Sequence, residues 1–438
     1  MITIVSSIIS SVFQLDNKRP DATPLRAGQV FNGKILKLFP NQTAEVQIGN
    51  QRMIAQLDVP LEVGRHYWLQ VQPSEGTVEL KLLDNNSLSL SRQEGLETVF
   101  KAFSLSSSKE NVEVVKYFLK EQLPISKELV QNAANWIKNS TQPLEELNTI
   151  NWMIKQGYPV TKDIYHALIS MNGKEKITEI MQSVLNGLQE ENQITSVSSS
   201  LKEVLTTLIS NEETPQINFQ STFLGDEKTF HPLLKKLIES LGFQYEKDVF
   251  TFLNGQENES IRQDNLKGLL IQYLSEKSDI SQKEPAEQLL QRITGMQLLS
   301  KDMGPVQQFI MQIPFPLWNR TTDLTLQWSG RKNEDGKIDP NFCRVIFYLE
   351  LETLKETMVD LRIQNRIISI KVLNENHQLL KELKSFQAML KENLKKMSYN
   401  LSSLEFEDIN DKQFNKRSHS KLPITYQNQS YTGVDIKV

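Results

Sequence analysis

The apolar residues of this chain change their spacing twice, and these changes divide the sequence into three folded segments. From residues 26 to 84 they alternate with polar residues, which predicts strands. From about residue 95 to 300 they recur every three or four positions, which predicts helices. Alternation returns from 303 to 408, followed by one long amphipathic stretch. The predicted fold class is therefore multidomain α+β, with a small N-terminal β-barrel, an all-α middle region and a C-terminal α/β sandwich of a sheet with one long helix.

The first segment contains five short predicted strands. They are Gln29–Phe39, Thr43–Ile48, Gln51–Leu57, Arg65–Val71 and Thr77–Leu83. Gly49-Asn50 forms a two-residue hairpin turn between the second and third strands. Gly33, inside the long first strand, predicts a bend or bulge there. Five strands in about 60 residues are typical of a closed barrel of the OB or SH3-like kind.

Two stretches of the helical segment repeat each other at an offset of 35 residues, FLKEQLPISKELV from Phe118 and MIKQGYPVTKDIY from Met153. In each, a proline ends one helix. Ser126 or Thr161 then caps the next helix, and such a cap stabilises a helix by about 1 kcal/mol. A weaker third copy is Gly242–Phe250. Two or three copies do not make a solenoid, so we predict a helical region.

Breaks and loose ends complete the predicted organisation. Residues 1–25 form an N-terminal arm, and Glu212–Asn218 is the predicted break within the helices. Thr195–Ser200 is a second candidate for a flexible segment. Residues 409–438 are predicted to be a flexible tail, whose final YTGVDIKV either pairs as a late strand or stays a free motif.

The third segment alternates strands with polar turns. Its predicted strands are Gln307–Pro314, Thr322–Ser329, Phe342–Glu352, Thr357–Ile363, Arg366–Leu373 and Leu401–Phe406. The amphipathic helix is predicted over Glu375–Met397. Asn333–Asp339 is predicted to be a turn, because Arg331 and Phe342 occupy the first and last positions that a calcium loop would need for ligands.

Composition excludes several kinds of chemistry. The single cysteine, Cys343, cannot form an intrachain disulfide, and the five histidines lack the spacing of paired metal ligands. No phosphate-binding, zinc-protease or nucleophile-elbow motif occurs. No apolar run is long enough to span a bilayer, and the N-terminus lacks the features of a signal peptide. We therefore expect a cytoplasmic protein that is not an enzyme, with no cofactor, no metal and no small-molecule substrate.

Nucleic-acid binding is a separate question, because OB-like barrels often bind single strands. The chain has 49 basic and 53 acidic residues, a net charge of −4. The barrel segment is neutral, with six basic residues (Arg26, Lys34, Lys37, Arg52, Arg65, Lys81) and six acidic ones (Glu45, Asp58, Glu62, Glu75, Glu79, Asp84). Tyr67 and Trp68 point to opposite faces of one strand, so at least one belongs to the core. Nucleic-acid binding through the barrel is kept as an alternative function.

The segment Val359–Phe406, within residues 303–408, resembles the C-terminal domain of the flagellar hook-length control family. The resemblance is an ordered pattern: the strand VDLRI, a polar turn, the strand RIISIKVL, a helix containing MLKENL, and the exit YNLSSLEF. It implies a non-enzymatic protein of a type III export system, which such an apparatus could itself export, whose C-terminal domain contacts the cytoplasmic domain of an export gate. The positions that match the switching strand and helix are Val359, Leu361, Leu390 and Leu394.

The sequence therefore leaves two functional hypotheses open. The first is hook-length control through contact of Val359, Leu361, Leu390 and Leu394 with an export-gate protein. The second is an adaptor or structural protein unrelated to flagella, or a weak nucleic-acid binder that uses the barrel. The same four leucine and valine positions also fit ordinary core packing.

Overall fold

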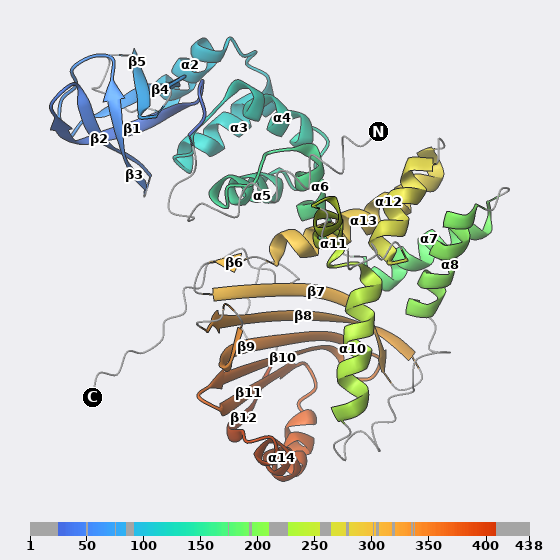
Figure 1. The fold of residues 1–438 in the computed structure, drawn as a ribbon. Coiled ribbons are helices and arrows are strands. Elements are labelled where there is room, and N and C mark those ends of the chain that lie inside the picture. The colour runs from blue at the N-terminus through green and yellow to red at the C-terminus, as the bar shows by residue number, and fades with distance from the viewer. Residues whose placement is uncertain are drawn as a thin grey trace. The chain divides into compact units, whose positions relative to one another are not determined.

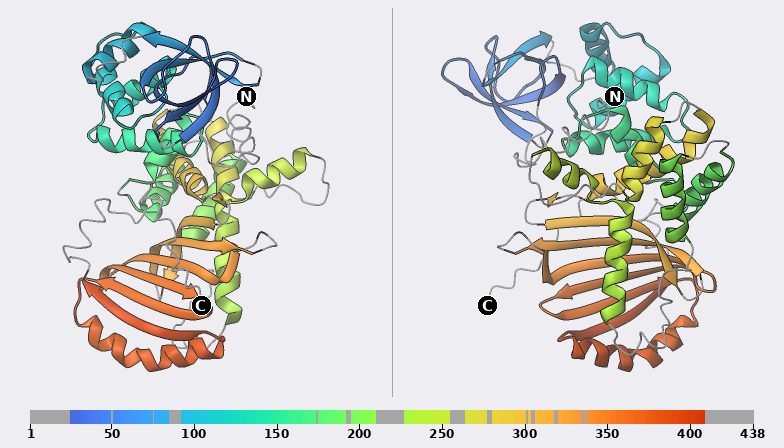
Figure 2. Two further views of the ribbon diagram at one scale, coloured as in Figure 1. Left: turned by 90° about the vertical axis from the view of Figure 1, so that its left-hand side faces the viewer. Right: turned by 45° about the vertical axis from the view of Figure 1, so that its right-hand side comes forward.

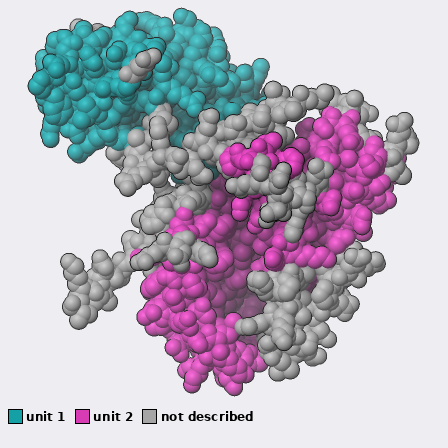
Figure 3. All heavy atoms as spheres, viewed as in Figure 1, with its two compact units in different colours: residues 1–165 teal, residues 166–438 magenta. Residues whose placement is uncertain are grey.

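The computed structural model describes residues 25–49, 51–74, 76–84, 92–173, 175–191, 195–209, 227–254, 264–276, 280–300, 302–303, 306–317, 320–333, 336 and 338–408 (Figure 1). The chain forms two compact units, residues 1–165 and 166–438. Figure 2 gives further views of the ribbon, and Figure 3 colours the two units separately. The multidomain α+β class is confirmed.

The first unit begins with a barrel of five strands. They are β1 (Val30–Phe39), β2 (Thr43–Ile48), β3 (Gln51–Leu57), β4 (His66–Gln72) and β5 (Val78–Asp84). Hydrogen bonding follows the order β1-β2-β3-β5-β4 and closes through β1 and β4. The barrel is therefore of the OB type, and every predicted strand agrees with the structure to within two residues at each end.

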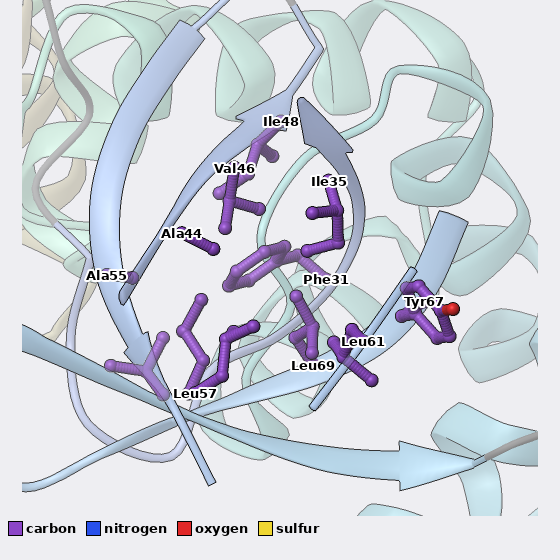
Figure 4. Packing of buried hydrophobic residues seen from close by; sticks show 12 residues of the cluster. Phe31, Ile35, Ala44, Val46, Ile48, Ala55, Leu57, Leu61, Tyr67 and Leu69 are labelled. Atoms are coloured by element: carbon purple, nitrogen blue, oxygen red, sulfur yellow. The ribbon is translucent and has the colours of Figure 1, made fainter. Parts of the chain in front are cut away.

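The barrel core is built from the inward-facing side chains of all five strands (Figure 4). Phe31, Val46 and Leu69 surround Gly33, where an added Cβ would lie 2.9 Å from both Phe31 Cε2 and Val46 Cγ1. Gly33 is thus required by close packing, and the bulge predicted there lies further along, between Ile35 and Lys37. After the bulge, the alternation of inward and outward side chains along β1 is therefore shifted by one residue.

Helices complete the first unit. They are α2 (Arg92–Phe103), α3 (Lys109–Lys120), α4 (Lys127–Ile137), α5 (Pro143–Lys155) and α6 (Lys162–Ser170), which crosses into the second unit. The Ser126 cap is confirmed, because its side chain accepts from the Leu129 N–H at 3.2 Å. Thr161 immediately precedes α6, and its carbonyl accepts from the Tyr165 N–H.

The segment before the Ser126 cap also joins the helices to the barrel. Ile125 forms an isolated antiparallel bridge with Val30, the first residue of β1. The two N–H···O bonds of this bridge are 2.7 and 2.8 Å long, and both side chains are fully buried. The barrel and the helices α3 and α4 of the first unit are therefore held together by backbone hydrogen bonds as well as by packing.

Six helices open the second unit in the described residues. They are α7 (Ile177–Gln189), α8 (Ser196–Ile209), α10 (Glu227–Leu241), α11 (Tyr245–Leu253), α12 (Leu266–Glu276) and α13 (Ile280–Leu299). The flexible segment predicted at 195–200 is wrong, because it begins α8. Ser198 N–H donates to Thr195 Oγ1 at 3.1 Å, and Thr195 N–H donates to Ser198 Oγ at 2.8 Å. The break predicted at 212–218 lies outside the described residues.

A seven-stranded sheet follows. Its strands are β6 (Asp302–Met303), β7 (Val306–Leu317), β8 (Arg320–Lys332), β9 (Ile338–Leu351), β10 (Lys355–Gln364), β11 (Ile367–Asn374) and β12 (Asn400–Asp408). The strands lie in the order β12-β11-β10-β9-β8-β7-β6, and only β11 and β12 are parallel. The helix α14 (Leu379–Lys396) connects them and lies along the β12 border of the sheet (Figure 2). The predicted sheet with one long helix is confirmed.

The outer edge of β7 is closed by α13. The Ile310 N–H donates to Ser300 Oγ at 2.9 Å, and the Gln312 N–H points to the Met296 sulfur at 2.9 Å. Because N–H groups alternate in direction along a strand, Pro314 and Pro316 stand at positions whose N–H would also face this edge. The sequence prediction ended the strand at Pro314, but a proline on the unpaired side of an edge strand removes no ladder bond, so β7 continues to Leu317.

Replacing Ser300 by alanine is expected to destabilise the protein by about 1–3 kcal/mol, because the N–H of the buried residue Ile310 loses its acceptor. Equilibrium unfolding in urea measures the change. Ser275→Ala is the matched control, since Ser275 also bonds a helix carbonyl (Gln272 O, 2.7 Å) but is exposed, and it should change stability by less than about 0.5 kcal/mol. Equal effects of the two substitutions would contradict this account of the edge.

Candidate nucleic-acid interface

The outward side chains of β1, β2 and β3 form one surface, which we call the β1–β3 face. Strand pairing arranges them in three cross-strand rows: Lys34–Gln47–Arg52, Lys37–Glu45–Ile54 and Phe39–Thr43–Gln56. Among these residues are three basic side chains and one acidic side chain. The barrel segment as a whole is neutral, so its charge is unevenly distributed and this face is basic.

The single acid of the β1–β3 face lies between two of the bases. Glu45 carboxylate oxygens are 3.9 Å from Lys37 Nζ and 3.9 Å from Arg52 Nη1. The Lys37 and Arg52 side chains are 70% and 67% exposed, whereas Glu45 is 20% exposed. Long ion pairs between such exposed groups contribute little stability. Both cations therefore remain available to an anion in solution.

Apolar side chains lie beside these charges. Phe39 is 42% exposed, Ile54 is 57% exposed, and the neighbouring Leu38 is also exposed. A surface that holds single-stranded nucleic acid combines basic groups for the backbone with an accessible aromatic ring on which a base stacks. Phe39 supplies such a ring within the β1–β3 face. Sequence analysis did not single out this residue.

The two aromatic residues that the sequence did single out have other roles. Tyr67 is buried in the barrel core, and its hydroxyl accepts from the Glu62 N–H at 3.1 Å. Trp68 faces outward, but its ring packs directly over Gly95 of α2, where an added Cβ would lie 3.0 Å from Trp68 Cζ2. The prediction that at least one of them is a core residue is confirmed. Neither lies on the β1–β3 face.

His66 extends the first row onto β4, where it pairs with Lys34. Its Nδ1 lies 2.9 Å from Asn32 Oδ1. Burial, and next the charge of Lys34, lower the pKa of His66 below its ordinary value. His66 is therefore neutral at neutral pH and adds hydrogen-bonding capacity, rather than charge, to the row.

The four candidate partner-binding residues of the C-terminal domain are brought together by the fold. Val359, Leu361, Leu390 and Leu394 are partly buried between the sheet and α14, and they pack against a buried cluster of Ile368, Ile370, Val372 and Leu401. They therefore hold α14 on the sheet. Their contacts are within the domain, and an acidic substitution at Leu390 or Leu394 would disturb this packing.

The described part of the chain offers little to other kinds of site. No group of three or more His, Cys, Asp and Glu residues there is arranged to hold a metal ion. Within the same residues, no helix combines the length and hydrophobicity that crossing a membrane requires. Cys343 is buried, and burial raises the pKa of its thiol. Of the predicted turn at Asn333–Asp339, the described residues show the Gly336 N–H donating to Asn333 O at 3.0 Å, and Ile338 and Asp339 already belong to β9.

The first unit thus begins with a module of the OB-barrel class, and comparison with known proteins agrees with this barrel. The model of the TP0910 S1-like domain matches residues 8–81, which contain the first four strands and part of the fifth. A relative in Bacillus subtilis (strain 168), named "Uncharacterized protein YlqG", is 20% identical over 510 aligned residues, covering 85% of this chain and 88% of the relative.

The similarity to the Bacillus protein covers far more of the chain than the barrel does, so the two proteins resemble each other beyond the S1-like domain. No solved structure matches this chain. Neither the domain model nor the relative is described in terms of hook-length control.

Proposed function

We propose that this protein binds single-stranded nucleic acid through the β1–β3 face, as a binding protein and not as an enzyme. The observation that carries the proposal is the combination on one surface of Lys34, Lys37, Arg52 and the exposed ring of Phe39. This surface includes strands 2 and 3 of an OB-type barrel, and that region of OB folds binds oligonucleotides. The S1-like match to the same residues supports this choice.

The geometry favours a single strand over a duplex. The cations project from β1 and β3, the two strands that flank β2, and Phe39 and Ile54 lie beside them. A single strand can place its phosphates on the cations and turn a base onto the ring, whereas the bases of a duplex are already stacked on each other. Glu45 opposes the phosphates, so we expect moderate affinity.

Titration of a fluorescein-labelled 12-nucleotide U oligomer, followed by anisotropy at several salt concentrations, tests the proposal. Neutralising Lys34, Lys37 and Arg52 to glutamine should weaken binding and reduce the salt slope by about 0.7 for each phosphate that is no longer neutralised. Phe39→Ala should weaken binding by about 1–3 kcal/mol with the salt slope unchanged, because stacking is not ionic. Glu45→Gln should tighten binding.

Lys81→Gln is the matched control. Lys81 is an exposed lysine of the same barrel, but it lies on β5, outside the β1–β3 face. Its substitution should leave both the affinity and the salt slope unchanged. The proposal is overturned if the unaltered protein shows no salt-dependent binding, or if Lys81→Gln weakens binding as much as the substitution of a single β1–β3 cation.

A further inference from the structure

The C-terminal sheet carries a line of polar side chains across five adjacent strands, far in sequence from the barrel. Strand pairing places Ser329 of β8 beside Arg344 of β9, Arg344 beside Arg362 of β10, Arg362 beside Ser369 of β11, and Ser369 beside Ser403 of β12. Directly paired residues point to the same side of a sheet. We call these five residues the polar row; the strands that carry it follow one another in Figure 1.

Two arginines stand directly opposite each other at the centre of the polar row. Like charges in this position repel unless an anion lies between them. Asp360 is that anion: Arg344 Nε and Nη2 each donate to its carboxylate at 2.8 Å, and Arg362 Nη2 donates at 3.0 Å. Burial would raise the pKa of Asp360, but the two arginines outweigh burial and hold it below its ordinary value. One carboxylate faces two guanidinium groups, so the centre keeps an excess positive charge.

Several donors of the polar row have no partner among the residues that the structure describes. The Arg362 side chain is 57% exposed, and of its five N–H groups one donates to Asp360. Ser329, Ser369 and Ser403 are partly exposed, and their hydroxyls form no hydrogen bond with the described residues. Guanidinium and hydroxyl groups in line are the donors that recognise phosphate oxygens.

Charge on the sheet is segregated along the strands. Arg331 lies beyond the polar row toward the β10–β11 turn, and its guanidinium is 5.8 Å from the centre of the Phe342 ring. Arg366 in that turn lies over Tyr399 in the same manner, at 5.9 Å. The acids Glu350 and Glu356 stand directly opposite each other on β9 and β10, toward the other end of these strands. Among the described residues, Arg331, Arg344, Arg362 and Arg366 outnumber the acids Asp339 and Asp360 at the end of the sheet that bears the polar row.

From this arrangement we propose that the polar row binds a linear chain of phosphate groups. Five strands spaced by about 4.8 Å extend the row over about 19 Å, which is longer than a single phosphate ion. A chain of phosphates could contact Arg344 and Arg362 at the centre and the serine hydroxyls on either side. Two sources share this chemistry, the backbone of a nucleic acid and inorganic polyphosphate. The site uses none of the residues of the β1–β3 face.

The test uses the full-length protein with Lys34, Lys37 and Arg52 changed to glutamine, so that the β1–β3 face does not dominate binding. The labelled 12-nucleotide U oligomer is titrated directly, with inorganic polyphosphate added as a competitor. In a separate experiment, the melting temperature of the protein is measured as polyphosphate is added. We expect Arg362→Gln to weaken binding at least about fivefold at low salt. Arg344 still satisfies Asp360 in this variant, so its melting temperature without ligand should be unchanged.

Lys355→Gln is the control, because Lys355 is an exposed base at the other end of the same strand, about 24 Å from Arg362 at about 3.4 Å per residue. It should not change binding. Tight binding of the oligomer assigns the site to nucleic acid, and binding of polyphosphate alone assigns it to that polymer. The proposal is overturned if the barrel-neutralised protein binds neither probe, or if Arg362→Gln and Lys355→Gln have the same effect. If the β1–β3 face does not bind nucleic acid, changing Lys34, Lys37 and Arg52 to glutamine will leave the affinity unchanged. That result is distinct from a failure of the polar row.

Discussion

Replacing Gly295 by alanine is expected to destabilise the second unit by about 3 kcal/mol, because α13 has no room for a methyl group at this position. An added Cβ would lie 2.2 Å from Ala167 O and 2.6 Å from Met171 Cγ. The first of these atoms belongs to the backbone, which cannot move aside by a change of rotamer. The helix α13 would have to shift away from the end of α6, and the tight packing around the buried Met296 would loosen with it.

Gly187→Ala is the control for this experiment. Gly187 also lies within a helix of the second unit, α7, but nothing is within 4 Å of an added Cβ. Alanine favours the helix over glycine, so this substitution should stabilise the protein by up to about 1 kcal/mol. Urea unfolding followed by circular dichroism gives both values. Opposite signs for the two substitutions are expected, and a Gly295→Ala variant as stable as the original protein would refute the packing argument.

The second large effect is expected at Lys267, a lysine of α12 that is 2% exposed. Its ammonium group donates to Glu246 and to Gln297. Gln297 in turn donates to Glu246 Oε2 at 2.8 Å and to Phe243 O at 3.0 Å, so the three side chains form one network. Lys267→Met removes the cation and leaves a largely buried carboxylate without its charge partner, which should cost about 3–5 kcal/mol.

A double-mutant cycle separates the coupling free energy between Lys267 and Glu246 from the loss of packing that each substitution causes. Combining Lys267→Met with Glu246→Gln removes both charges, so the double variant should be more stable than the sum of the single effects predicts. Lys235→Met serves as an exposed control, because Lys235 pairs with Glu239 at 3.9 Å on the surface of α10 and should contribute less than about 0.5 kcal/mol. Additive single effects in urea unfolding would contradict a coupled network.

Local signals in the sequence predicted most of the fold. The barrel strands and the sheet strands were recognisable because hairpins pair residues close in sequence, and their turns carry Gly49 or Asn365 in the left-handed region. The Ser126 cap was recognisable because it also joins residues that are close in sequence, Ser126 and Leu129. The end of β7 was not, because a proline is tolerated in a strand when its N–H side faces away from the paired neighbour, and only the sheet order shows that this side of Pro314 and Pro316 is unpaired.

The candidate sites could not be found in the same way. The neutral total charge of the barrel concealed a basic face, because the position of the bulge between Ile35 and Lys37 decides that Lys37 and Phe39 join Lys34 on the outside. The polar row draws its five residues from five strands, and only the register of the sheet brings them into line. Sequence spacing contains neither piece of information.

The backbone bridge between Val30 and Ile125 has a consequence for how a bound strand would act on this protein. It ties the start of β1 to the helices at a second point, well beyond the end of β5. A force on a nucleic acid bound to the β1–β3 face would therefore be transmitted through this bridge to α3 and α4 and would not act on the barrel alone. The helices that this bridge joins to the barrel lie beyond the S1-like match, which ends at residue 81.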